Sequence, residues 1–199
     1  MRGDTPTSCS RQGGFTLLEA AIAVLVILVM AAAAAPSLRA YSVEAHLLGA
    51  GRAFKFEFMK ARSMAIKQGV YTAIRFEPRG EQVFYSVYAD GDRDGVLSSD
   101  IRSGRDRRVA GPFPLSGGAP RVRVGINPGV PAIPPARGTL EGDPIRFGSS
   151  DMLSFSPLGT ATPGTFYLAG EGVQAAVRVN PGSARVRLMT CRGKKWRER

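Results

Sequence analysis

The sequence predicts an α+β fold in which one long N-terminal helix, with a membrane-embedded first half, packs on antiparallel β-sheets. Three features support this class: an apolar segment at residues 15–35, helical spacing of apolar residues from there to residue 68, and two-residue alternation after Gly69. With 199 residues and 44% hydrophobic content, the chain is long enough for one domain with a core.

A polar leader, residues 1–14, precedes the apolar segment and carries Arg2 and Arg11. Residues 15–36 are enough, at about 1.5 Å per helical residue, to cross a hydrocarbon core of about 30 Å. The basic leader favours a cytoplasmic amino terminus, which predicts a single-pass inner-membrane protein with a periplasmic C-terminal domain. Signal-peptidase cleavage after the alanines at 31–35 is the alternative. Lipidation of Cys9 is excluded because no apolar run precedes it.

Glu19 places a carboxylate inside this apolar helix, where a charge costs on the order of 3 kcal/mol, so we expect it to have a function. The run Gly14-Phe15-Thr16-Leu17-Leu18-Glu19 resembles the type III signal of bacterial type IV prepilins and type II secretion pseudopilins. The resemblance implies that prepilin peptidase cleaves after Gly14 and methylates Phe15. It also implies that Glu19 pairs with the terminal ammonium of a neighbouring pilin subunit during assembly. An ordinary membrane anchor with a chance glutamate is the alternative.

The helix is predicted to continue as an amphipathic segment over residues 37–69, and Gly69 supplies its end signal. His46 is expected to be exposed on it. The aromatic rings of Phe54, Phe56 and Phe58 cannot all lie on one face of a helix. This spacing predicts core contacts on one side of the helix and filament contacts on the other.

A β-rich domain is predicted at residues 70–190, because short alternating runs are separated by turn residues. The turn at 180–183 predicts a terminal hairpin, and the Pro- and Gly-rich stretches 111–120 and 127–142 are predicted to be surface loops. The runs that indicate strands are residues 70–76, 82–88, 121–126, 164–168, 173–179 and 184–189. Residues 61–66 and 155–159, with the closing hairpin, resemble the GspH/FimT family, which implies a pilin-like fold.

An acidic loop resembles the first half of a calcium-binding loop, in which alternate side-chain oxygens converge on the ion. Its candidate ligands are Asp90, Asp92, Asp94 and Asp100. The acidic closing ligand belongs at Ile101, one residue later than the last of these, so a helix-loop-helix site is not indicated. The alternative is a turn of solvated acids without a metal, which Arg93 inside the loop favours.

The C-terminal residues are strongly basic in a chain that has 27 Lys and Arg against 16 Asp and Glu. Residues 191–199 are predicted to be a basic tail whose flexible cations contact phosphates and whose tryptophan stacks on a base. Some FimT-like minor pilins capture DNA through such a region, and Ser183-Ala184-Arg185-Val186-Arg187 matches their motif in its two arginines. The candidate DNA-binding residues are Arg185, Arg187, Arg192, Lys194, Lys195, Trp196 and Arg197. Solvation of a strand end, or contact with anionic lipid headgroups, is the alternative.

Catalysis is not predicted, because a single histidine leaves a catalytic triad or a histidine cluster without its parts. No cofactor is expected beyond the calcium alternative, and Cys9 and Cys191 are not expected to form a structural disulfide. The principal interpretation is a structural minor pseudopilin or minor pilin of the GspH/FimT type. The alternatives are a DNA-binding minor pilin acting in DNA uptake and a membrane-anchored periplasmic enzyme.

Overall fold

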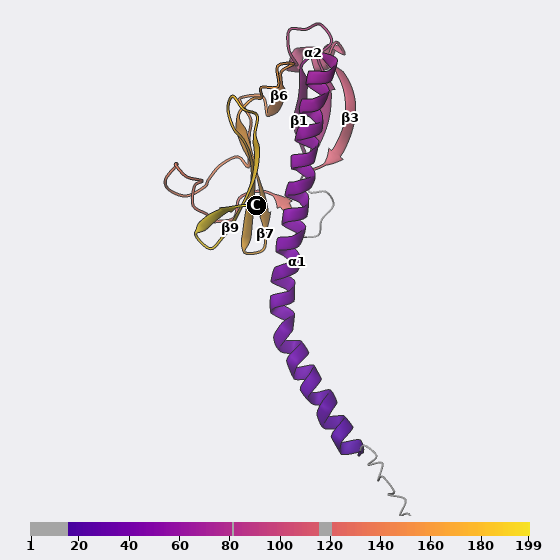
Figure 1. Ribbon diagram of the computed structural model, residues 1–199, viewed down its shortest axis with the longest axis vertical. Helices are drawn as coiled ribbons and strands as arrows, with labels where there is room; N and C mark the ends of the chain where they lie inside the picture. Colours follow the sequence, from indigo (N-terminus) through magenta and orange to yellow (C-terminus); the bar gives the residue numbers. More distant parts are fainter. Residues whose placement is uncertain (1–15, 81, 116–120) are drawn as a thin grey trace, which may run out of the picture. The chain divides into compact units, whose positions relative to one another are not determined.

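The computed structural model describes residues 16–80, 82–115 and 121–199. The chain divides into two units, Met1–Arg39 and Ala40–Arg199, and helix α1, Leu17–Gln68, runs through both (Figure 1). Cys9, the expected cleavage residue Gly14 and the expected methylated residue Phe15 lie outside the described residues.

In the first unit, α1 begins where Thr16 acts as its N-cap. The Thr16 Oγ1 accepts a hydrogen bond from the Glu19 backbone N–H at 3.3 Å, and the Thr16 carbonyl accepts the first helical bond from Ala20. The apolar side chains that follow are exposed to the surroundings, as Leu17 at 90% and Met30 at 67% illustrate. Among the described residues, α1 is the helix long and apolar enough to cross a membrane, with a mean hydropathy of 2.7 over its most apolar window. Pro36 lies inside the helix.

The second unit contains two antiparallel sheets and the second half of α1. Sheet A has the strand order β3-β2-β1-β6, and sheet B the order β10-β9-β8-β7-β4, with β5 also paired to β7. The elements after α1 are β1 (Thr72–Arg79), β2 (Gln82–Ala89), α2 (Ser98–Ser103), β3 (Arg107–Pro114), β4 (Arg123–Val124), β5 (Ile145–Arg146), β6 (Met152–Phe155), β7 (Gly164–Gly170), β8 (Val173–Val179), β9 (Val186–Arg192) and β10 (Lys195–Glu198).

Aromatic side chains on one face of α1 form the centre of the core. Phe58 is fully buried and Phe54 is 4% exposed, and the ring of Phe54 lies 4.7 Å from that of Phe166 on β7. The helix approaches β9 closely at Gly51, because a Cβ there would lie 2.5 Å from Leu188 Cδ1. Phe56, on the opposite face, is 66% exposed. The predicted division of the three rings between core and surface is therefore confirmed, as is the exposed position of His46.

The α+β prediction and the single helix ending before Gly69 are confirmed, and each of the six predicted strands contains or overlaps a strand of the structure. The predicted loop at 111–120 is wrong over its first four residues, which belong to β3. Proline is tolerated there because, within the part of the chain that the structure describes, β3 pairs with β2 alone and is an edge strand.

Two predictions about the end of the chain are also wrong. The turn at 180–183 joins β8 to β9, but the terminal hairpin is β9–β10. The expected flexible tail is structured, since Cys191 and Arg192 complete β9 and Lys195–Glu198 form β10. Its many charges obscured a strand that follows the Gly193 turn.

Candidate functional site

Glu19 lies in the first turn of α1, three residues after the N-cap Thr16. This Thr-x-x-Glu spacing is that of a capping box, so an acidic residue here suits the positive end of the helix dipole. The Glu19 carboxylate therefore lies near the positive end of the helix dipole, and the assembly role stays a prediction from the sequence.

Backbone amides organise the acidic loop between β2 and α2. Asp90 Oδ1 accepts hydrogen bonds from the N–H groups of Asp92 and Arg93, at 3.1 and 2.7 Å, and Asp90 Oδ2 accepts one from Gly95 at 3.0 Å. The buried Asp106 accepts two more amide bonds from the loop, at 3.1 and 2.9 Å. Sequence reasoning missed Asp106 because it lies outside the alternating run.

The structure divides the candidate calcium ligands. Carboxylate oxygens of Asp90, Asp92 and Asp94 lie within 4.8 Å of one another, and Asp100 is outside this group. Arg105 Nη1 pairs with Asp100 at 3.3 Å and also with Asp92 at 3.7 Å. A hydrogen bond with Asp92, together with slight desolvation and the neighbouring carboxylates, raises the pKa of Asp94. The first three residues fit an oxygen-coordinated cation. Calcium at these three residues stays a prediction.

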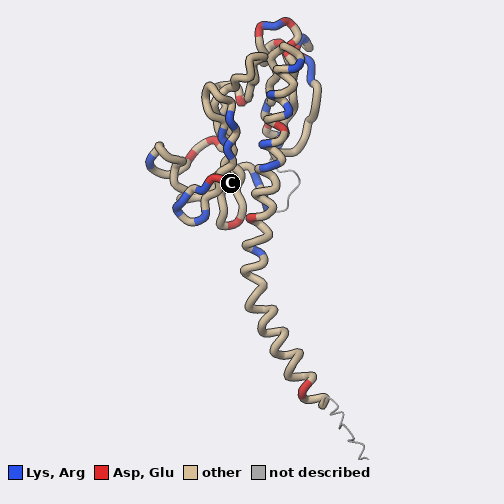
Figure 2. The backbone as a smooth tube through the Cα atoms, viewed as in Figure 1, with Lys and Arg blue, Asp and Glu red and all other residues tan. Residues whose placement is uncertain are grey.

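Lys and Arg residues gather along the β9–β10 hairpin (Figure 2). Pairing of Trp196 with Cys191 and of Glu198 with Met189 places these four side chains on one face. Lys195 and Arg197, paired with Arg192 and Thr190, face the other way. Of the expected DNA-binding residues, Arg187 and Trp196 therefore lie on the first face, and Arg192, Lys195 and Arg197 lie on the opposite one. Arg185 precedes β9, and Lys194 lies in the turn between the two strands.

On the first face, Glu198 engages the two arginines of the expected motif. Arg187 Nε lies 3.0 Å from both carboxylate oxygens, and Arg185 Nη2 lies 3.8 Å from one of them. The hydrogen bond from Arg187 lowers the pKa of Glu198 and raises that of Arg187. The half-buried Trp196 packs in a cluster with Cys191, and its Nε1 donates to the Pro131 carbonyl at 2.8 Å. Stacking of this ring on a base would require that contact to break.

A row of arginines extends this first face across sheet B. Successive strand pairings align Arg146 on β5 with Thr165 on β7, Thr165 with Arg178 on β8, and Arg178 with Arg187 on β9. The Arg146 guanidinium lies over the Tyr167 ring, 5.3 Å from its centroid. Sequence reasoning missed this row because its members lie far apart in the chain.

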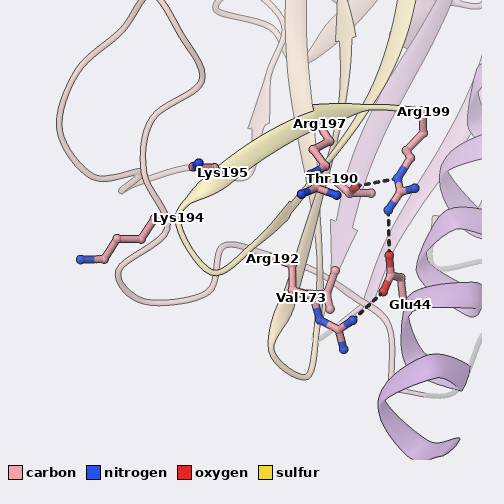
Figure 3. A pocket seen from close by; sticks show the side chains of 8 residues that line it. All are labelled: Glu44, Val173, Thr190, Arg192, Lys194, Lys195, Arg197 and Arg199. Atoms are coloured by element: carbon pink, nitrogen blue, oxygen red, sulfur yellow. Dashed lines mark hydrogen bonds and ion pairs between the residues drawn. The ribbon is translucent and has the colours of Figure 1, made fainter. Parts of the chain in front are cut away.

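On the second face, the hairpin borders a hollow of about 450 Å³ (Figure 3). Glu44 on α1 pairs with Arg192 Nη1 at 3.3 Å and with Arg199 Nη2 at 3.1 Å. The residues that line the hollow are Glu44, Val173, Thr190, Arg192, Lys194, Lys195, Arg197 and Arg199. Sequence reasoning missed Glu44, which lies 148 residues from Arg192, and did not select Arg199, although it continues the alternation of residues 195 and 197.

Comparisons with known proteins match two segments of the chain. Residues 9–35 match the model of the prokaryotic N-terminal methylation motif. Residues 50–183 match the model described as type II transport protein GspH. Comparison with curated proteins and comparison with solved structures found no match.

Proposed function

The chain belongs to the GspH family of type II transport proteins, and we propose that it is a minor pseudopilin or minor pilin with a structural, non-enzymatic role. The observation that carries the proposal is the order of the two matches: a methylation motif over residues 9–35, at the start of α1, followed by a GspH domain over 50–183. The apolar helix and the prepilin motif indicate a membrane-anchored, single-pass protein.

In this proposal, prepilin peptidase cleaves after Gly14 and methylates Phe15, and the chain then assembles with other pilin subunits in a secretion pseudopilus or type IV pilus. The amino terminus faces the cytoplasm and the domain the periplasm, in line with Arg2 and Arg11 in the leader. Glu19 neutralises the ammonium of a neighbouring subunit, which removes two unpaired charges from an apolar filament core.

Exposed apolar side chains on α1 within the second unit support assembly. Tyr41 is 73% exposed, Phe56 66%, Met59 56% and Ile66 49%. Such side chains on a helix face are the surface that packing against another subunit would cover.

The test is the amino-terminal residue and intact mass of the protein recovered from membranes, with and without active prepilin peptidase. We expect N-methylated Phe15 only with the peptidase. An intact Met1 in both strains, or cleavage near Ala35, would refute the proposal. A Glu19→Ala variant serves as the matched assembly control, because it should be processed normally yet be absent from sheared filaments.

A second candidate function is DNA binding during uptake. Its support is cationic surface: Lys194, Lys195 and Arg197 are exposed and have no ion pair among the described residues, and the arginine row extends across sheet B. The full chain in neutral micelles should then bind duplex DNA with an affinity that falls as salt rises. Replacing the three exposed cations by alanine should weaken binding and flatten the salt dependence, whereas unchanged binding would exclude this function for them.

A further inference from the structure

The hollow between α1 and the β9–β10 hairpin is lined mainly by cationic side chains, which suits a phosphate group (Figure 3). We propose that it holds the headgroup of an anionic phospholipid, of the phosphatidylglycerol class, in the membrane that anchors the chain. This inference rests on the anchoring in the proposed function.

The charge of the hollow is strongly positive. Five cationic side chains and one carboxylate, Glu44, line it, which leaves a net charge of +4. Glu44 is largely buried, its side chain being 17% exposed, so it acts as a fixed acceptor that orients Arg192 and Arg199. Each guanidinium carries five N–H donors, and the pairs with Glu44 leave donors free for phosphate oxygens.

The remaining lining suits a phosphoglycerol group. The Thr190 Oγ1 accepts a hydrogen bond from Arg199 Nε at 3.2 Å, and Val173 provides apolar surface. Figure 3 shows Arg197 beside Thr190, while Lys194 extends outward at the rim. A volume of about 450 Å³ accommodates a headgroup and its phosphate, with arginines that can bind two phosphate oxygens at once.

The chain itself limits how far the hollow can lie from lipid. Glu44 follows Pro36, at the end of the apolar segment, by only eight residues. Fully extended, such a segment spans at most about 29 Å, and as a helix about 12 Å. The chain thus tethers Glu44, with its partners Arg192 and Arg199, within this distance of the end of the apolar segment, which is within reach of headgroups. This proximity favours lipid over DNA as the ligand.

The experiment uses the full processed chain, purified in neutral detergent and mixed with equal amounts of phosphatidylglycerol and phosphatidylcholine. Native mass spectrometry counts each lipid retained. We expect wild type to prefer phosphatidylglycerol, and Lys194→Ala/Lys195→Ala/Arg197→Ala to lose that preference at least fivefold, since one basic residue near an anionic surface is worth about fivefold in affinity. A matched variant that removes three exposed cations elsewhere, Lys67→Ala/Arg107→Ala/Arg108→Ala, should retain it.

Four results would overturn the inference. Wild type could retain both lipids equally, or the two triple variants could lose the preference for phosphatidylglycerol to the same extent. Millimolar inorganic phosphate could displace the bound lipid completely, or the first variant could lose DNA binding while it still retains phosphatidylglycerol. The displacement result would assign the hollow to free phosphate, and the last to nucleic acid. Carbonate extraction separates this inference from the proposed function. A chain that stays in carbonate-washed membranes but shows no lipid preference refutes only the inference, whereas a chain that is washed out refutes the anchoring as well.

Discussion

Replacing Gln174 by leucine should destabilise the domain by about 3–5 kcal/mol. Gln174 on β8 is fully buried. Its Nε2 donates to the carbonyls of Gly125 and Leu168, at 2.8 and 3.0 Å, and its Oε1 accepts from the Asn127 N–H at 2.8 Å. Leucine fills the space but offers no hydrogen bond, so three backbone groups lose a partner.

The magnitude follows from the cost of buried, unpaired backbone groups, which is about 1–3 kcal/mol each. The total is the sum over the two carbonyls and one N–H that lose their partner, and the burial of an apolar leucine side chain in place of the amide offsets part of it. The remainder is a large fraction of the roughly 5–15 kcal/mol that holds a domain folded. The variant should therefore unfold at a clearly lower denaturant concentration.

The assay is urea unfolding of the full chain in detergent, followed by the fluorescence of Trp196. This is the single tryptophan of the chain, and it lies on β10 in the same sheet as Gln174. The matched control is Gln82→Leu, an exposed residue on β2, which should change stability by no more than about 0.5 kcal/mol. A Gln174→Leu protein with the wild-type midpoint and slope would refute the reasoning.

Three further predictions concern the acidic loop and the core. Asp106→Ala should lower the free energy of unfolding by about 2–4 kcal/mol in the same assay, because two loop amides lose their acceptor. Asp106→Asn should lower it by less, and an equal loss in the two variants would contradict this prediction. If calcium binds the loop, calcium should raise the Tm of the protein. Asp94→Asn should abolish this rise, and Asp100→Asn should preserve it. Equal Tm values with calcium and with a chelator would exclude calcium binding at the loop. Burial, with a smaller contribution from Glu57, raises the pKa of Tyr85 to about 12. The unfolded chain therefore releases this proton first, and stability should fall as pH rises from about 10 to about 12. Tyr85→Phe should reduce that fall, as measured by unfolding at each pH.

The sequence was most informative where period and length decide the structure. The helix from Leu17 to Gln68 was predictable because a continuous apolar segment leads into apolar residues at helical spacing, and Gly69 ends the helix at a positive φ of 66°. Strand β8 was predicted with its observed bounds, since an apolar run between two turns leaves little choice. Strand β3 was missed because Pro112 and Pro114 obscure the alternation, and only its edge position makes them acceptable.

The candidate site was predictable in composition but not in arrangement. The basic residues of the last segment lie close together on one hairpin, yet their division between two faces depends on the pairing of Trp196 with Cys191. The fold brings Glu44 next to Arg192 and Arg199. This contact could not be predicted, because no local sequence pattern links Glu44 to residues at the other end of the chain. Long-range charge pairs of this kind leave no signal in the spacing of a single sequence.

The two acidic partners of the hairpin determine which of its faces can attract an anion. Glu198 pairs with Arg185 and Arg187 on one face, most closely with Arg187, and offsets one of their two positive charges. Glu44 serves two arginines on the other face, where Lys195 and Arg197 add charge that no described residue pairs. Because attraction of a polyanion scales with unneutralised charge, Arg197→Ala should weaken anion binding more than Arg187→Ala. Glu44→Gln should strengthen it, since it removes the one negative charge of the hollow while the glutamine Oε1 can still accept hydrogen bonds from the arginines.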